Sequence, residues 1–522
     1  MAEEYDVVVV GGGNAALCAA ISAANEGARV LLLERAGLDE RGGNSVYTDG
    51  LMRTVYDGAE DIRRFCPDLT DAEVAVSDFG AYGEADFFDD MARITQYRTD
   101  PELCEILVTK SRETILWLRD QGVRFFPNFG RQAYRVNGRF KFWGGATIAV
   151  KSGGPGLVDT LYKTAETLGV AVRYKAWVRE LASSDDGGVS GVVLVNEAGE
   201  KETVRAGAVV LACGGFEANA EWRARYLGPG WDLAKVRGSR FNTGDGLAMA
   251  LAAGAQPFGH WSGCHAVSWE RNALDFGDLV LTPQYQRHSY PVSIMVNLEG
   301  RRFVDEGADF RNYTYAKYGH AVLHQPGQVA WQVFDAKVLH LLRDEYRTRN
   351  VTKVRADTLE ELADKLEEID KAQFLATVAE FNASVREDAA FDPNIKDGRS
   401  AASNGVPRSN WANRIDTPPF EAYAVTCGVT FTFGGVRISA DGAVLDTRSE
   451  PIRGLYAAGE MVGGLFYFNY PGASGLTSGS VFGRIAGGSA AVFARSRELR
   501  TEARSGLGAP RSLPAQKPRG FR

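Results

Sequence analysis

Apolar runs and glycines near the start of the chain follow the order that a βαβ unit requires. The segment YDVVVVGGGNAALCAAISAANEGARVLLLER, residues 5–35, reads as an apolar strand, a glycine turn, a helix of small residues and a second apolar strand ending at Glu34. Gly11 permits the tight turn, and Gly13 lets the backbone approach a pyrophosphate at the helix N-terminus. Ala16 takes the third position of the glycine fingerprint, and Glu34 lies where an acid accepts ribose hydroxyls. The pattern predicts a bound nucleotide cofactor.

The remaining pattern predicts a nucleotide-binding domain that is interrupted by another domain. Apolar residues at helical spacing predict mostly helix over 71–121, a buried strand is expected in AVVLACGG, and a helix is expected after the turn NTGDG. The stretch after this helix mixes aromatic and basic residues with helices and has no second glycine fingerprint. We therefore expect the first part of the nucleotide-binding domain at 1–255, an inserted domain at 256–426, the C-terminal part at 427–495 and a basic, flexible tail at 496–522.

Composition and charge exclude several classes of protein. A chain of 522 residues with 45% hydrophobic and 24% charged residues is typical of a globular α/β protein with more than one core. No apolar run reaches the roughly eighteen residues of a membrane helix, and the start MAEEYDVVVV lacks a secretory signal, so we expect a cytoplasmic protein without a membrane span. The net charge of -7 argues against nucleic acid as a partner. The six cysteines have no CxxC spacing, and neither a metal nor haem is expected.

Several separated segments together resemble the FAD-dependent fumarate reductase and succinate dehydrogenase flavoprotein superfamily. They are GGGNAA with Glu34, RGGNS, VVLACGGF, TGDG, VNLEGRRFVDE, FTFGGVRI and GLYAAGE. Within it, GGGNAALCAA, LLLER and RGSRFNTGDG look most like the tricarballylate dehydrogenase branch, whereas NYPGASG is similar to the YPG turn of the 3-ketosteroid dehydrogenases. The resemblance implies an α/β fold: a Rossmann-like FAD-binding domain of the glutathione reductase type with an inserted α+β capping domain.

The resemblance also implies FAD, held by several glycine-rich segments. Gly459 and Glu460 can approach the ribityl chain and pyrophosphate, while Gly475 and Leu476 can present backbone amides to the flavin ring. Some relatives attach FAD through a histidine in the loop after the ribose acid, but the loop here, residues 41–50, has none, so non-covalent FAD is expected. The expected cofactor-binding residues are Gly11, Gly13, Asn14, Ala15, Ala16, Glu34, Arg35, Gly42, Gly43, Asn44, Ser45, Val178, Ala212, Gly214, Gly215, Thr243, Gly244, Asp245, Gly459, Glu460, Gly475 and Leu476.

The inserted domain is expected to supply the catalytic groups. In the family, hydride passes between flavin N5 and a substrate carbon, and an arginine shortly after an RFVNE segment handles the proton. The matching residue in RRFVDEGADFRNY is Arg311, and the family histidine beyond the TGDG helix matches His265. Because a guanidinium is a poor acid at its usual pKa, we expect a proton relay from Glu306 or Asp309.

Two departures from the family pattern concern the substrate. Relatives that bind a dicarboxylate have a histidine and an arginine where this chain has Phe431 and Tyr470, so the charge complementary to a second carboxylate is absent there. Fumarate and succinate are therefore expected to be poor substrates. Tyr470 can also donate a hydrogen bond to a substrate carbonyl, and it joins Arg311 and His265 as a catalytic candidate. The predicted substrate-binding residues are Arg287, His288, Tyr290, Phe431 and Tyr467.

These observations predict an enzyme that desaturates or reduces a C–C bond next to a carboxylate or carbonyl. Its substrate would be an organic acid or a cyclic ketone, and its electron donor or acceptor is unidentified. A ketosteroid-dehydrogenase-like enzyme acting on a cyclic ketone is one alternative. A lyase, hydratase or isomerase that keeps the flavin without net redox change is another, and an electron carrier or binding module is a third. Bleaching of the flavin by substrate without oxygen separates the redox enzymes from the rest.

Overall fold

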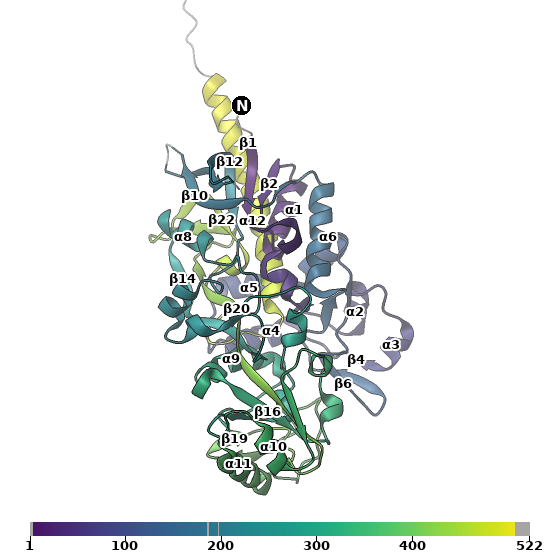
Figure 1. The fold of residues 1–522 in the computed structure, drawn as a ribbon. Coiled ribbons are helices and arrows are strands. Elements are labelled where there is room, and N and C mark those ends of the chain that lie inside the picture. Colours follow the sequence, from purple (N-terminus) through teal and green to yellow (C-terminus); the bar gives the residue numbers. More distant parts are fainter. Residues whose placement is uncertain (1–3, 185–186, 197, 507–522) are drawn as a thin grey trace, which may run out of the picture.

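A sheet of eight strands and a sheet of six strands organise the fold (Figure 1). The computed structural model describes residues 4–506 except 185, 186 and 197. The eight-stranded sheet forms the centre of the nucleotide-binding part, in the upper half of Figure 1, and the six-stranded sheet leads down into the capping part. The mixed α/β architecture that the sequence predicts is thus confirmed.

The eight-stranded sheet places the glycine turn of the βαβ unit at the carboxyl ends of parallel strands. Its order is β10-β11-β12-β1-β2-β9, with β22 beside β12 and β21 beside β22, and the pairs β1–β2, β1–β12, β2–β9 and β12–β22 are parallel. Buried parallel strands read as continuous apolar runs, as the first strand does. The strands are β1 (Glu4–Val10), β2 (Val30–Leu33), β9 (Ala171–Arg173), β10 (Trp177–Ser183), β11 (Val189–Val195), β12 (Lys201–Leu211), β21 (Ala443–Leu445) and β22 (Pro451–Ala457).

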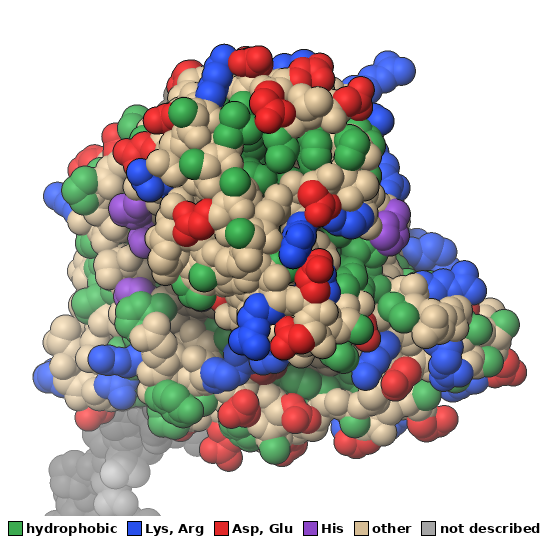
Figure 2. Space-filling view, turned by 90° about the horizontal axis from the view of Figure 1, so that it is seen from below, with side chains coloured by type: hydrophobic (Ala, Val, Ile, Leu, Met, Phe, Trp, Pro, Cys, Tyr) green, Lys and Arg blue, Asp and Glu red, His purple; other side chains and the backbone are tan. Residues whose placement is uncertain are grey.

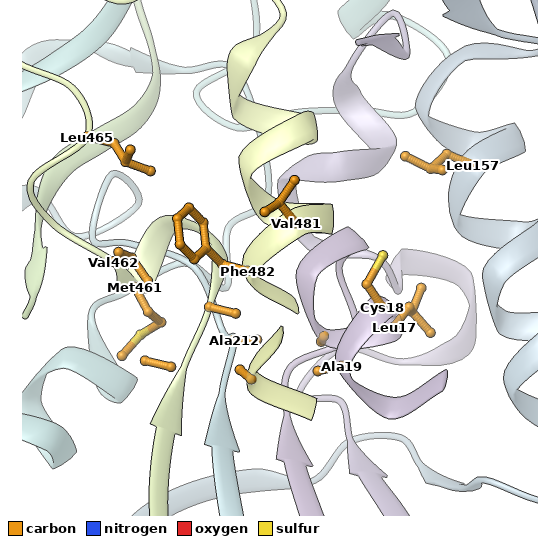
Figure 3. Packing of buried hydrophobic residues seen from close by; sticks show 14 of the residues in the cluster. Leu17, Cys18, Ala19, Leu157, Ala212, Met461, Val462, Leu465, Val481 and Phe482 are labelled. Carbon is orange, nitrogen blue, oxygen red and sulfur yellow. The ribbon is translucent and has the colours of Figure 1, made fainter. Parts of the chain in front are cut away.

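Helix α12 (Ser474–Gly506) returns the C-terminal part of the chain to α1 (Asn14–Asn25). Glycines make this contact close, because a Cβ at Gly483 would lie 2.5 Å from the carbonyl oxygen of Ala15, and one at Gly487 would lie 2.1 Å from that of Ala19. Figure 3 shows Val481 and Phe482 of α12 in the same apolar cluster as Leu17 of α1, which points toward Leu157 of α6 (Gly153–Thr167). The N-terminal end of α12 therefore lies beside the glycine turn after β1.

The region predicted to be mostly helical, residues 71–121, contains three helices and one short strand on the flank of the nucleotide-binding part. Its last and longest helix, α5 (Pro101–Asp120), begins at an Asp100 N-cap whose side chain accepts a hydrogen bond from Leu103 N. The other elements before the capping part are α2 (Ala59–Phe65), α3 (Asp71–Ala75), α4 (Glu84–Ile94), α7 (Ala220–Trp222), α8 (Asp245–Ala252), β3 (Leu51–Met52), β4 (Ser77–Asp78), β5 (Phe125–Pro127), β6 (Ala133–Val136), β7 (Arg139–Phe142) and β8 (Ile148–Val150).

The capping part is joined to the nucleotide-binding part by two long antiparallel strands. Strand β14 (Pro257–Glu270) leaves it and β20 (Phe420–Val436) returns, so the boundary predicted between residues 426 and 427 falls inside one continuous strand. The other capping elements are β13 (Lys235–Val236), β15 (Ile294–Asn297), β16 (Ala330–Phe334), β17 (Lys353–Ala356), β18 (Ala401–Ser403), β19 (Val406–Arg408), α9 (Tyr315–Leu323), α10 (Leu359–Lys365) and α11 (Lys371–Ser384).

The first part of the predicted basic tail, residues 496–506, continues helix α12. The expected disorder beyond about Ser505 falls mostly on residues 507–522, which lie outside the described residues. On the face seen from below, acidic and basic side chains are interspersed and form no broad cationic surface (Figure 2). Within residues 4–506, apart from the three left out, no helix has both the length and the apolarity that crossing a membrane requires.

Candidate active site

One cavity joins the glycine turn after β1 to the capping part. Most of the predicted cofactor-binding residues line it, together with five of the residues predicted for catalysis or substrate binding, His265, His288, Arg311, Phe431 and Tyr470. The cofactor residues on its wall are Gly11, Gly13, Asn14, Ala15, Glu34, Arg35, Gly43, Asn44, Ser45, Val178, Ala212, Gly214, Asp245, Gly459, Glu460, Gly475 and Leu476. Segments far apart in the sequence thus meet around one ligand-sized space.

The first wall of the cavity is shaped for a close ligand. Gly11 has φ +113°, and a Cβ there would lie 2.4 Å from the carbonyl oxygen of Ala212, so only glycine fits this turn. Gly13 is the N-cap of α1, which directs backbone amides and the positive end of the helix dipole at the cavity. Asn14 ties the turn to both neighbouring segments: its backbone amide donates to Ser45 Oγ at 3.0 Å and its side chain donates to the Leu476 carbonyl at 2.9 Å.

Glu34 is held behind the turn, as the nucleotide-binding motif requires. Its side chain is only 5% exposed, and Oε1 accepts a hydrogen bond of 2.8 Å from the backbone amide of Ala36. Burial raises the pKa of Glu34, and the hydrogen bond from Ala36 opposes that shift. A Cβ at Gly12 would lie 2.2 Å from Glu34 Oε2, so Gly12 is also required by this carboxylate. The buried acid and the open amides beside it fit a dinucleotide.

Arg35 extends the wall next to Glu34. Its guanidinium donates to Thr243 Oγ1 at 2.6 Å and to Asp245 Oδ2 at 2.7 Å, and it lies 4.4 Å from the centre of the Trp177 ring. The turn NTGDG and the helix after it therefore position this arginine. Thr243 does not line the cavity, but its hydroxyl oxygen accepts the hydrogen bond that positions Arg35.

Five predicted cofactor residues lie outside the cavity lining. The glycines among them leave room for neighbouring side chains. At Gly215, for example, a Cβ would lie 2.2 Å from Glu460 Oε1, so this glycine leaves room for that carboxylate. At Gly42 a Cβ would lie 2.5 Å from the Val46 side chain. The five residues are Ala16, Gly42, Gly215, Thr243 and Gly244.

Sequence reasoning missed a buried carboxyl pair at the cofactor end. Glu217 is fully buried and its carboxyl group contacts that of Glu460, which lines the cavity. Amides of Asn44 and Asn242 donate to Glu217 Oε1 at 2.5 and 2.6 Å. Burial raises the pKa of both carboxyl groups, and the like charge of Glu460 raises that of Glu217 further. Such a pair titrates as a unit that shares a proton.

His265 faces the opposite end of the cavity because of an irregularity in β14. The pairing of β14 with β20 shifts register immediately after the pair of His265 with Phe431, and such bulges re-aim side chains. Neither ring nitrogen of His265 has a hydrogen-bond partner among the described residues. Burial and the nearby charge of Arg237 hold its pKa well below the usual value. The ring is therefore neutral at neutral pH and open to a ligand.

Arg311 points into the same end from a short 3-10 turn, Arg311–Tyr313. It is 9% exposed, its Nε has no hydrogen-bond partner in the described chain, and its one long hydrogen bond of 3.4 Å goes to the carbonyl of Arg131. Burial, together with the charge of Arg343, lowers the pKa of Arg311 to about 9. A guanidinium in this state releases its proton more readily than an exposed one.

Tyr315 lies next to Arg311, and Tyr470 lies next to Tyr315. The guanidinium carbon lies 5.2 Å from the centre of the Tyr315 ring, and the hydroxyl groups of Tyr315 and Tyr470 form a hydrogen bond of 2.5 Å. Burial and the contact with Tyr470 raise the pKa of Tyr315 well above its usual value. His265 packs against both rings, each at a centroid distance of 4.8 Å.

Three predicted substrate-binding residues do not line the cavity. Arg287 is committed to an ion pair of 2.7 Å with Glu270 and to backbone carbonyls. The Tyr290 hydroxyl bonds to Thr314 Oγ1 at 2.7 Å, and Tyr467 stacks on His260 outside the cavity lining. Charge and aromaticity in the sequence do not reveal which partner a side chain finds in the folded chain.

The expected proton relay is not assembled either. Glu306 pairs with Arg302 and Arg408 in a buried cluster, and Asp309 pairs with Arg93 at 2.7 Å. No hydrogen bond or ion pair joins either acid to Arg311 among the described residues. The cavity wall also includes Tyr315, and it has lining residues that the sequence did not single out. Among these are Asp49, Gln132, Arg237, Gln286, Asn312 and Phe433. Their surroundings in the sequence carry no pattern that distinguishes them from ordinary loop and core residues.

Comparisons with known proteins agree with this arrangement. Residues 6–476 match the FAD binding domain family. The chain is 30% identical over 500 residues to a probable fumarate reductase of Shewanella frigidimarina, covering 94% of this chain and 76% of the relative. It is 29% identical to a vinyl phenol reductase of Lactiplantibacillus plantarum, covering 95% of this chain and 98% of the relative.

The fold agrees with a solved structure as well. The 3-ketosteroid-Δ4-(5α)-dehydrogenase of Rhodococcus jostii, in complex with 4-androstene-3,17-dione, superposes with a TM-score of 0.67 at 26% identity and covers 94% of this chain and 97% of that chain. The likeness to tricarballylate dehydrogenases stays a prediction. The motif set, the cradle and the family match lead to one conclusion: the chain belongs to the FAD-binding family of fumarate reductase-like flavoproteins and is an FAD-dependent oxidoreductase acting on CH–CH groups.

Proposed function

We propose that this protein desaturates or reduces the C–C bond next to the carboxylate of an organic acid and exchanges electrons with a separate donor or acceptor. The observation that carries the proposal is the single cavity that joins the dinucleotide cradle to Arg311. FAD bound in the cradle would supply hydride chemistry. Residues of this chain would bind the acid, orient it and move the proton.

Arg311 is proposed to hold the substrate carboxylate and to handle the proton. Its planar fork can bind two carboxylate oxygens, and its Nε is not engaged by any described residue. The pKa of about 9 brings its proton within reach of neutral-pH catalysis. Because Glu306 and Asp309 are committed elsewhere, the hydroxyl pair of Tyr315 and Tyr470 is the proposed partner for that proton.

His265 is proposed to donate a hydrogen bond to the substrate. A neutral imidazole carries one N–H, and neither of its nitrogens is satisfied by the described chain. His288, also buried and without a hydrogen-bond partner, would act in the same way. Ring contacts of Phe431 with Phe433, Phe466 and Tyr470 would enclose the apolar part of the substrate.

A cyclic ketone is the second candidate substrate. The Tyr470 hydroxyl lies at the cavity wall, hydrogen-bonded to Tyr315, and two linked hydroxyls can polarise a carbonyl oxygen. The likeness to the ketosteroid dehydrogenase favours this reading, whereas the cationic groups around Arg311 favour an acid.

The test is an anaerobic screen with the purified flavoprotein. Saturated acids and ketones are tested for bleaching of the oxidised flavin, and unsaturated ones for reoxidation of flavin reduced with dithionite. Reoxidation by α,β-unsaturated acids, lost in Arg311→Lys, supports the proposal. Reoxidation by cyclic enones alone would favour the ketone reading. Product formation without any change in flavin absorbance would show a non-redox enzyme.

A further inference from the structure

Arg237 is a second cation at the substrate end of the cavity, and the proposed function does not use it. Its backbone amide donates to the Val429 carbonyl at 2.7 Å, which fixes the residue beside β20. The side chain lines the cavity, the residue is 6% exposed, and its Nε has no hydrogen-bond partner within the described residues. The only acid within 4.0 Å in the described chain is Asp49, at that limiting distance. Burying a guanidinium that is paired so weakly is unfavourable, and a bound anion would compensate its charge.

The charges around this end do not balance. Four arginines lie there, and the only carboxylates paired with them in the described chain are Asp49 and Glu345. Arg131 occupies both acids, at 3.0 and 3.7 Å. His265 and His288 add no further positive charge, since burial and neighbouring arginines lower the pKa of each well below its usual value. Two positive charges therefore remain without a paired carboxylate, and a substrate with a single carboxylate would neutralise only one of them. The four arginines are Arg131, Arg237, Arg311 and Arg343.

The two lining arginines, Arg237 and Arg311, lie near the same residues at the substrate end of the cavity. Both Arg237 and Arg311 act electrostatically on His288 and on Tyr315. Aromatic rings line this end as well: the ring centroids of Phe431 and Phe466 lie 5.9 Å apart, and those of Phe466 and Tyr470 lie 5.3 Å apart. A substrate that matches both sets of residues carries two anionic groups for the arginines and a hydrocarbon part for the aromatic rings.

We propose that the preferred substrate is a branched dicarboxylic acid, with one carboxylate bound by Arg311 and the other by Arg237. The inference rests on the proposed function and names the substrate class of that site. A linear trans diacid such as fumarate would direct its second carboxylate at Phe431 and Phe466, whereas a branched one turns both toward the arginines. In the reductive direction the C=C bond gains a hydride and a proton, and a one-electron donor such as reduced viologen supplies two electrons in two steps.

The test uses pairs of acids that differ by one carboxylate. Itaconate is methacrylate with CH2COO⁻ in place of a methyl group, and fumarate is crotonate with a carboxylate in place of its methyl group. With the holoenzyme and reduced viologen, we expect kcat/KM for itaconate to exceed that for methacrylate by about 30-fold or more, the effect of a buried charged partner. The ratio of kcat/KM for fumarate to that for crotonate should be smaller than the ratio for itaconate to methacrylate. Arg237→Gln should remove most of the itaconate advantage, and Arg237→Lys should keep part of it.

Arg240→Gln is the matched control, because Arg240 lies three residues further on with a side chain that is 57% exposed. It should leave the ratio of itaconate to methacrylate unchanged. Binding is measured separately by titrating methylsuccinate and isobutyrate against the absorbance of the oxidised flavin. An equal kcat/KM for itaconate and methacrylate in the native enzyme, or a methylsuccinate affinity that Arg237→Gln does not change, overturns the inference. Reoxidation by no unsaturated acid at all overturns the proposed function instead, and weaker methylsuccinate binding in Arg237→Gln would still support the Arg237 site.

Discussion

Replacing Arg311 by lysine tests the centre of the proposed site. Lysine keeps the positive charge but loses the planar fork that binds two carboxylate oxygens in parallel. We expect the variant to retain flavin, because the cradle around Gly11 and Glu34 is formed by other elements. We also expect it to lose most of its turnover.

The expected magnitudes follow from the contacts of Arg311. Its one hydrogen bond within the described chain is 3.4 Å long, so its loss should change the free energy of unfolding by about 1 kcal/mol or less. The repulsion from Arg343, which together with burial lowers the pKa of Arg311, persists in the variant because lysine keeps the positive charge. In contrast, removing one preorganised donor at a reacting group typically lowers kcat by about 10²–10³-fold.

The assay compares kcat and the melting temperature of the native protein with those of Arg311→Lys and Arg343→Lys. Arg343 is a close control, because it donates to the same Arg131 carbonyl at 3.2 Å but does not line the cavity. Near-native turnover in Arg311→Lys would make Arg311 a structural residue and refute the reasoning. The proton role would then fall to Tyr315, since Tyr313, the other tyrosine nearby in the sequence, is bound to Asp90 at 2.6 Å.

Further predictions concern pH and the cofactor. If protonated Arg311 is required, kcat should fall as the pH rises through about 9, and a flat profile to higher pH would contradict this role. Glu34→Ala should weaken FAD binding by about 10- to 100-fold, the effect of roughly 1.5–3 kcal/mol for a charge-assisted hydrogen bond, whereas Tyr162→Phe, behind Glu34, should not; equal dissociation constants would remove Glu34 from the site. Acid precipitation should release free FAD, because loop 41–50 has no histidine; flavin that stays with the protein would show a covalent link. Because the pKa values of Glu217 and Glu460 are raised in the folded state, this pair stabilises the fold at low pH, and that stabilisation is lost as the pH rises through the two raised pKa values. The melting temperature should therefore fall less steeply toward alkaline pH in Glu217→Gln than in the native protein.

The cofactor end of the site follows from the sequence to a large extent. The turn around Gly11 and the acid at Glu34 are local features, because a βαβ unit sets the distance between them through one short helix. Their chemistry depends on backbone shape, which glycine and strand-length apolar runs determine directly. The segments around Gly459 and Gly475 could be assigned because a known family places them at the same cofactor.

The substrate end was decided by tertiary structure. His265 and Arg311 could be located by their positions relative to family motifs, but the ion pair of Arg287 with Glu270 depends on a loop residue that folds back onto the end of a strand. Whether an arginine is free or paired is a property of its neighbours in space, and the sequence does not name them.

Arg237 is a second example of a residue whose surroundings the sequence does not reveal. Nothing in RGSRFNTGDG distinguishes Arg237 from Arg240, yet the first is buried in the cavity wall and the second has a 57% exposed side chain. The difference comes from the pairing of β13 with β20, a contact between residues nearly two hundred positions apart. The sequence by itself therefore determined the nucleotide site through local backbone geometry, and its family motifs indicated FAD and the class of reaction. The tertiary structure decided which charges face the substrate, because electrostatic pairing acts through space and not along the chain.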